Sequence, residues 1–98
     1  MKISKIIWHD EFVDKNIRKH NVEPHEVEEV IFNTEDPPRF FFVEKGDEKG
    51  EDMYAVMGRS EAGRYLRVYF IYKVDQEAAL IISAREMTDT EKKRYEKK

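Results

Sequence analysis

The sequence predicts an α+β fold, an antiparallel β-sheet with an N-terminal helical hairpin and a C-terminal helix packed on one side. Residues 10–32 contain segments whose apolar side chains recur at three- and four-residue spacing, as in amphipathic helices. Residues 39–85 contain apolar, strand-like runs joined by short polar turns, the pattern of consecutive β-hairpins. Thr88 and Glu91 have the spacing of a capping box, which predicts a closing helix that runs toward Lys97.

Length and composition limit the class of protein. A chain of 98 residues suits one domain with a modest core, so we expect a single domain over residues 1–98. Cysteine is absent, which excludes disulfides and thiolate zinc sites, and no apolar run resembles a membrane span or signal peptide. We therefore expect a cytoplasmic protein without membrane contacts. The formal net charge of -3 argues against a general nucleic-acid binder, although the basic segment 59–67 could hold a phosphate.

The helical part of the chain follows a short predicted strand over residues 2–8. Asp10 is a candidate N-cap for a helix that runs to about His20, and Asn21, which tolerates the left-handed conformation, ends it. Pro24 suits the first turn of a second helix, which ends before a proline-containing loop. We expect these two helices to form a hairpin on one face of the sheet.

The later strands are predicted over residues 39–44, 53–59, 64–73 and 78–85. Alternation within residues 64–73 gives a core face with Leu66, Val68, Phe70 and Tyr72, and an exposed face with Tyr65, Arg67, Tyr69 and Ile71. In the last strand it places Ile81, Ser83 and Arg85 on one face. Arginines inside such apolar strands either form structural ion pairs or face an anion.

The relative position of Arg67 and Arg85 stays open at this stage. An odd number of residues in the turn between their strands places them side by side, whereas an even number separates them by parity. Side by side, and together with Tyr69 and Ser83, they would form a charge-assisted donor set of the size of a phosphate. The alternative is ordinary pairing with surface carboxylates, which is worth about 0–1 kcal/mol per pair.

The histidines offer acid–base chemistry without a metal site. His9, His20 and His25 have no metal-binding spacing, so we expect neither a metal nor another cofactor. His20, beside Lys19 at a helix end, is the best placed to act as a general acid or base near neutral pH. A histidine in that position more commonly stabilises the C-terminal dipole of its helix.

Several segments occur in an order and spacing that are typical of a known family. They are Trp8-His9-Asp10, residues 16–22 (NIRKHNV), 24–30 (PHEVEEV), 54–64 (YAVMGRSEAGR) and 81–95 (IISAREMTDTEKKRY). Over nearly its whole length the chain thus resembles the BrnT family of type II toxins, whose fold is similar to that of the RelE-type ribonucleases. Asn21 stands where this family usually has a glycine, and Leu80 where its members often carry an arginine.

The resemblance implies a small, metal-independent endoribonuclease. In such enzymes the ribose 2′-hydroxyl attacks the adjacent phosphate and leaves a 2′,3′-cyclic phosphate and a 5′-hydroxyl. Arg67 and Arg85 would stabilise the transition state, and His20 or Tyr69 would transfer protons. The remaining candidate residues, which would bind the RNA substrate, are Lys19, Arg59, Arg64 and Ser83.

The resemblance also implies a protein partner, an antitoxin whose ribbon-helix-helix domain reads operator DNA so that the toxin itself does not. One alternative is a catalytically weak or inactive module that binds this antitoxin and acts in operon autoregulation, or more broadly as a co-regulator of transcription. Leu80 favours that alternative, whereas the intact segment 83–85 favours the ribonuclease. The exposed edge strand over residues 39–44 could pair with the antitoxin or with a second copy in a homodimer.

Overall fold

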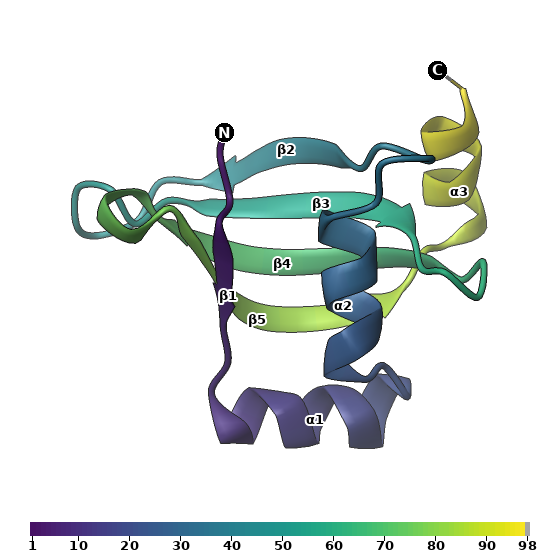
Figure 1. Ribbon diagram of the computed structural model, residues 1–98, viewed down its shortest axis with the longest axis horizontal. Helices are drawn as coiled ribbons and strands as arrows, with labels where there is room; N and C mark the ends of the chain where they lie inside the picture. Colours follow the sequence, from purple (N-terminus) through teal and green to yellow (C-terminus); the bar gives the residue numbers. More distant parts are fainter. Residues whose placement is uncertain (98) are drawn as a thin grey trace.

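The computed structural model describes residues 1–97 and contains a five-stranded sheet and three α-helices (Figure 1). The elements are β1 (Lys5–Ile7), α1 (Asp10–His20), α2 (Pro24–Ile31), β2 (Arg39–Glu44), β3 (Met53–Arg59), β4 (Tyr65–Lys73), a 3-10 turn (Val74–Gln76), β5 (Ala78–Glu86) and α3 (Asp89–Glu96). The predicted bounds of β2 and β3 are confirmed, and other boundaries differ by a few residues. Within residues 1–97, no helix is both long and apolar enough to cross a membrane.

The sheet has the strand order β1-β5-β4-β3-β2 and is mixed. Strands β2 to β5 form a meander in which every neighbouring pair is antiparallel. β1 instead pairs in parallel with the start of β5, through Lys5–Ile7 and Ala78–Leu80. The prediction of an antiparallel sheet is therefore wrong for β1. The helices and strands that separate β1 from β5 in the chain allow the crossover that a parallel pair requires.

The hydrophobic core lies between α2 and one face of the sheet. Its buried members are Val22, Val27, Val30 and Ile31 from the helical segment and Val56, Leu66, Val68, Phe70, Ala79, Ile81 and Ala84 from the strands. α2 packs on β3 and β4, whereas α1 runs beside β5 (Figure 1). The two helices thus contact different strands, and the predicted helical hairpin is not confirmed.

α3 covers part of the opposite face of the sheet, so the prediction that all helices lie on one side is wrong. Its capping box is confirmed, because the Thr88 hydroxyl accepts the Glu91 N–H at 3.2 Å while Glu91 accepts the Thr88 N–H at 2.9 Å. Tyr95 is buried on this face and makes an edge-to-face contact with Tyr65 of β4. A single buried aromatic side chain therefore anchors the end of a short, highly polar helix.

The ends of α1 confirm one prediction and correct another. Asn21 ends the helix in the left-handed conformation, with φ 54° and ψ 41°. The N-cap is His9 and not Asp10, because His9 keeps an extended backbone and Asp10 is already the first helical residue. The Asp10 carboxylate thus lies in the first turn, where it still interacts favourably with the helix dipole.

A β-bulge in β5 determines which side chains face the core. Tyr69 pairs with Ser83 and Phe70 pairs with Ile81, so Ile82 is an extra residue without a partner on β4. Ile81 consequently points into the core beside Phe70 and is fully buried. The prediction that it shares a face with Ser83 is therefore wrong, because the bulge reverses the alternation between them.

Asn16 contacts the outer edge of β5 where this edge does not pair with β1. Beyond Leu80, the outer edge of β5 has no strand partner within residues 1–97. Asn16 of α1 is 2% exposed, and its side-chain oxygen accepts the Ala84 N–H at 3.1 Å. One buried amide oxygen thus satisfies a backbone N–H at this edge and connects α1 to the sheet.

We expect the substitution Asn16→Ala to lower the free energy of unfolding by about 1–3 kcal/mol, because it leaves the Ala84 N–H without an acceptor. Lys15→Ala, at the neighbouring exposed position, should change it by less than about 0.5 kcal/mol. Urea unfolding followed by circular dichroism measures both values. Equal stability of the two variants would show that the edge does not depend on Asn16.

Candidate active site

Arg67 and Arg85 lie directly opposite each other on β4 and β5, on the face of the sheet that carries α3. We call them the arginine pair. The Tyr69 hydroxyl oxygen lies between them and accepts hydrogen bonds from Arg67 Nε at 2.8 Å and Arg85 Nη2 at 3.4 Å. Both arginine side chains are largely shielded from solvent, at 20% and 29% exposure, which strengthens their effect on a bound anion.

The bulge at Ile82 accounts for this juxtaposition. The pair Lys73–Ala78 closes the hairpin around the four residues 74–77, an even number that would separate the arginines in a regular ladder. The extra residue shifts the rest of β5 by one position, so that Arg85 comes opposite Arg67. The sequence contains no glycine or proline near Ile82 that would predict the bulge.

Glu91 of α3 occupies the arginine pair. Its two carboxylate oxygens accept hydrogen bonds from Arg85 Nη1 at 2.8 Å and Nη2 at 2.9 Å, and one of them lies 3.4 Å from Arg67 Nη1. The hydrogen bonds from Arg85 lower the pKa of Glu91 from 4.5 to about 2, and the same pairing raises the pKa of Arg85. Of the two alternatives from the sequence, the structure therefore contains pairing with a carboxylate of the chain, and the anion site remains a prediction.

A basic groove adjoins the arginine pair. It has a volume of about 510 Å³ and is lined by Arg39, Phe41, Met57, Arg67, Glu91, Arg94 and Lys97. Phe41 lies beneath Arg67, with its ring centre 5.8 Å from the guanidinium carbon. Sequence reasoning missed Arg39, Arg94 and Lys97 because they come from β2 and from the end of α3, which only the fold brings together. The groove combines cations with an exposed aromatic ring, as single-stranded nucleic acid binding requires.

Ser83 lies beside Tyr69 and the arginine pair, the group of side chains with which the sequence placed it. It is the cross-strand partner of Tyr69 and shares the face of the arginine pair. Its hydroxyl makes no hydrogen bond within residues 1–97 and can therefore donate to a bound phosphate oxygen.

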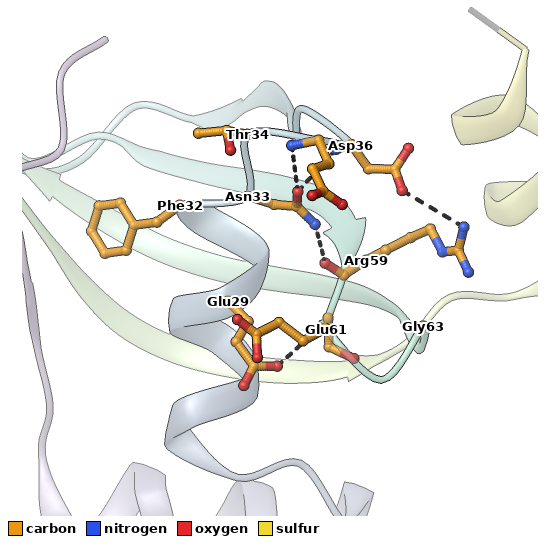
Figure 2. A pocket seen from close by; sticks show the side chains of 10 residues that line it. Glu29, Phe32, Asn33, Thr34, Asp36, Arg59, Glu61 and Gly63 are labelled. Carbon is orange, nitrogen blue, oxygen red and sulfur yellow. Dashed lines mark hydrogen bonds and ion pairs between the residues drawn. The ribbon is translucent and has the colours of Figure 1, made fainter.

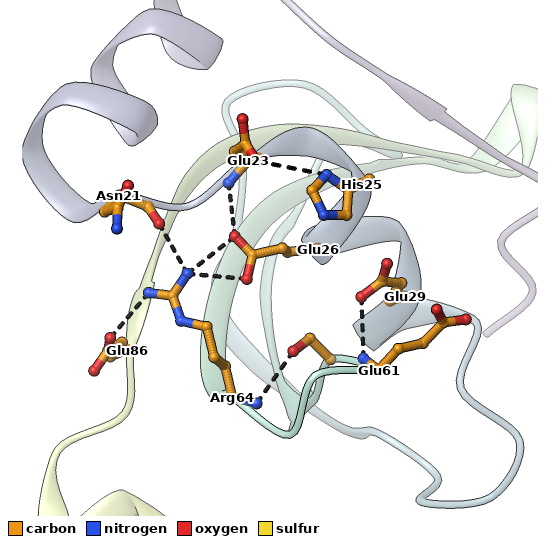
Figure 3. Close-up of polar contacts among 9 residues, drawn as sticks. Asn21, Glu23, His25, Glu26, Glu29, Glu61, Arg64 and Glu86 are labelled. Carbon is orange, nitrogen blue, oxygen red and sulfur yellow. Dashed lines mark hydrogen bonds and ion pairs between the residues drawn. The ribbon is translucent and has the colours of Figure 1, made fainter.

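Arg64 lies away from the arginine pair, in a network that joins α2 to the end of β5 (Figure 3). Its Nη1 donates to Glu26 at 2.9 Å and to the Asn21 carbonyl at 2.8 Å, and its Nη2 donates to Glu86 at 2.9 Å. Burial lowers the pKa of Arg64, but the hydrogen bonds to Glu86 and Glu26 more than compensate and raise it. This guanidinium is thus engaged by two carboxylates and a helix end.

Arg59 borders a different hollow, of about 530 Å³, between the end of α2 and the β3–β4 turn (Figure 2). The hollow carries the carboxylates of Glu29, Glu35, Asp36 and Glu61. Arg59 Nη1 lies 3.7 Å from Asp36, and its guanidinium stacks on Tyr65 with the ring centre 4.7 Å away. The excess of carboxylates in this hollow repels a phosphate backbone.

His20 and Lys19 lie at the C-terminal end of α1. The adjoining Asn21 accepts a hydrogen bond from Arg64 through its carbonyl oxygen. Within residues 1–97, no hydrogen bond or ion pair joins His20 to the arginine pair. Of the candidates from the sequence, the fold therefore brings Arg67, Arg85, Tyr69 and Ser83 together and places Lys19, His20, Arg59 and Arg64 elsewhere.

Comparisons with known proteins agree with this architecture. A family model described as the ribonuclease toxin BrnT of type II toxin-antitoxin systems matches residues 8–91. No curated protein matches the chain. Among solved structures, the chain is similar to the Brucella abortus ribonuclease toxin BrnT, determined at 1.1 Å, with a TM-score of 0.61 and 22% identity. The alignment covers 87% of this chain and 97% of the other, and at this identity it shows a shared fold.

The family match begins before α1 and extends into α3, and so includes every element that contributes to the arginine pair. The chain belongs to the BrnT family of ribonuclease toxins of type II toxin-antitoxin systems.

Proposed function

We propose that this protein is a metal-independent endoribonuclease in which the arginine pair holds the scissile phosphate of RNA. The observation that carries the proposal is the direct opposition of Arg67 and Arg85 around the Tyr69 hydroxyl. Two planar guanidinium groups can share the oxygens of one phosphate and stabilise the charge that builds up on it during cleavage. The RelE-type likeness expected from the sequence remains a prediction and supplies the reaction class.

The proposed reaction is an internal transesterification. The ribose 2′-oxygen forms a bond to phosphorus, the bond from phosphorus to the 5′-oxygen of the next nucleotide breaks, and the products are a 2′,3′-cyclic phosphate and a 5′-hydroxyl. One proton leaves the 2′-hydroxyl and one is added to the departing 5′-oxygen. The enzyme must therefore supply a proton acceptor, a proton donor and positive charge.

Tyr69 is the residue best placed to donate the proton. Its oxygen accepts from both arginines, so its own hydrogen is free to point toward a substrate bound between them. The phenolate left behind would face two guanidinium groups, which stabilise its negative charge. His20 was the other candidate from the sequence, but its place at the end of α1 makes it the weaker one.

RNA binding is proposed to use the basic groove. Arg39, Arg94 and Lys97 would contact phosphates next to the scissile one, and Phe41 would stack on a base. Lys19 on α1, which forms no ion pair within residues 1–97, would contact a longer RNA, whereas Arg64 and Arg59 are held by carboxylates and would contribute less. In this proposal Ser83 donates to a phosphate oxygen.

Glu91 must leave the arginine pair before a phosphate can enter, because both would bind the same guanidinium donors. The occupied pair, together with Leu80 in place of the arginine frequent in the family, favours a second candidate function. In that candidate the chain cleaves RNA weakly or not at all and acts through a ribbon-helix-helix antitoxin. In the first candidate, the same kind of antitoxin neutralises the ribonuclease.

We expect Arg85→Ala to lower the rate of RNA cleavage by about 10²–10³-fold, because one of two groups that stabilise the transition state is lost. The test is production of each variant alone in a host cell, with growth and total RNA integrity followed. Purified protein is then assayed on an RNA oligonucleotide and on the same oligonucleotide with 2′-deoxyribose at the cleaved position, which should resist cleavage.

Arg18→Ala is the matched control, because Arg18 is an exposed arginine on α1 that pairs only loosely with Asp14, at 4.0 Å. It should cleave like the wild type, and thermal unfolding establishes that both variants fold. A folded Arg85→Ala variant with wild-type cleavage would refute the role of the arginine pair. A folded wild-type chain that leaves RNA intact would establish the second candidate function instead.

We expect Glu91→Gln to bind RNA more tightly, by roughly tenfold, because glutamine keeps the capping box but removes the competing negative charge. Fluorescence anisotropy with an RNA whose 2′-hydroxyls are methylated measures binding without cleavage. Asp89→Asn, on the same helix turn and without a contact to the arginines, is the control. Weaker binding by Glu91→Gln would indicate that Glu91 organises the arginines for RNA and does not compete with it.

The ionisation of Glu91 should also make the stability of the fold depend on pH in the acid range. Because the pKa of Glu91 is lowered to about 2 in the folded protein, its ionised carboxylate stabilises the fold above pH 4.5. This stabilisation is lost as the pH falls from 4.5 to about 2. Near neutral pH the wild type should be more stable than Glu91→Gln by about 2–3 kcal/mol. Urea unfolding at a series of pH values should show this difference vanish across that window. A difference independent of pH would contradict the assignment.

A further inference from the structure

The edge strand β2 carries a run of exposed apolar side chains. Phe40, Phe41, Phe42 and Val43 are 38%, 38%, 59% and 40% exposed, and they follow one another along one strand. β2 pairs with β3 on its inner side, and no other strand within residues 1–97 covers its outer side. An edge strand with free backbone groups and large apolar side chains is a template for another strand.

The two ends of β2 carry opposite charges, and neither forms an ion pair within residues 1–97. Arg39 begins the strand and donates to the carbonyls of Arg94 and Lys97 at the end of α3. Glu44 ends the strand and makes no ion pair within residues 1–97. A strand with a cation at one end and a carboxylate at the other is complementary in charge to an antiparallel copy of itself.

A β-bulge in β2 places the two charged side chains on the same face of the sheet. Phe42 pairs with Tyr54 and Glu44 pairs with Met53, so Val43 is the extra residue. Without it, Glu44 would point to the face opposite Arg39. With it, Arg39, Phe41 and Glu44 share the face of the arginine pair, because their partners on β3 share that face.

We propose that β2 pairs with β2 of a second copy of this chain in an antiparallel, two-fold symmetric arrangement. The dyad passes beside Phe41, which lies opposite Phe41 of the partner subunit. Phe40 then lies opposite the partner's Phe42, and Arg39 lies opposite the partner's Glu44, with Val43 left out of the pairing on both sides. In each pair the two side chains lie on the same face of the sheet, and they are either both aromatic or opposite in charge. The two sheets then form one continuous sheet.

The dimer would combine the two basic grooves, since Arg39 and Phe41 line the groove and also lie at the proposed interface. The dimer itself does not depend on the ribonuclease proposal, but a role for the combined groove in RNA binding does. An interface of one short strand from each subunit is small, so we expect a dimer that forms at high micromolar concentration.

Cysteine substitution tests the register, because the chain has no cysteine of its own. Phe41→Cys should form a disulfide-linked dimer on mild oxidation, since directly opposite Cβ atoms in such pairs lie about 4.5–5.5 Å apart. Phe40→Cys and Phe42→Cys should cross-link efficiently only when mixed with each other. Val74→Cys, which is 54% exposed at the β4–β5 turn, is the control for random collision.

Charge reversal provides a second test without oxidation. Sedimentation equilibrium should show Glu44→Arg to be monomeric where the wild type dimerises, because it would place two arginines opposite each other. The double variant Arg39→Glu with Glu44→Arg should dimerise again. RNA cleavage is not part of either readout, so failure of the ribonuclease proposal leaves both tests intact.

The proposal fails if Phe41→Cys cross-links no faster than Val74→Cys, or if the wild type remains monomeric at high concentration. A monomer whose β2 amides become protected from hydrogen exchange only on addition of a ribbon-helix-helix antitoxin would also refute it. That result would assign the same edge to the antitoxin.

Discussion

The extra residue Ile82 is the constraint on which the site depends. A regular ladder continued from the pair Lys73–Ala78 would put Arg85 opposite Leu66, whose side chain is fully buried in the core. The bulge moves Arg85 opposite Arg67 instead, and bulges beside active sites commonly serve to redirect a side chain in this way.

This arrangement creates a problem, because two facing guanidinium groups repel each other. Glu91 resolves it with hydrogen bonds to Arg85 and an ion pair with Arg67, and it does so from the N3 position of the capping box of α3. The residue that completes the capping box is therefore also the counterion of the site. Burial of Tyr95 at the far end of the same helix holds that counterion in place, so the stability of α3 and the charge state of the site are coupled.

The parts of the fold that depend on local sequence were predictable. The bounds of β2 and β3, the left-handed Asn21 and the capping box at Thr88 follow from alternation and from the preferences of single residues. Features that depend on distant residues were not predictable. The parallel pairing of β1, the face covered by α3 and the bulge at Ile82 have no local signal, and the partners of Arg64 are far from it in sequence.

The pairing of β1 with β5 has a consequence for the order in which the protein acquires its structure on the ribosome. Lys5 of β1 cannot pair with Ala78 of β5 until that strand has been synthesised. Arg67 likewise has no Arg85 opposite it until then. Both contacts thus depend on the last strand to emerge, and the contact between β1 and β5, which are far apart in sequence, forms slowly. A nascent or prematurely terminated chain that ends before β5 would carry one arginine on an incomplete sheet. If the arginine pair acts as proposed, the chain would lack a complete site until its synthesis is almost finished.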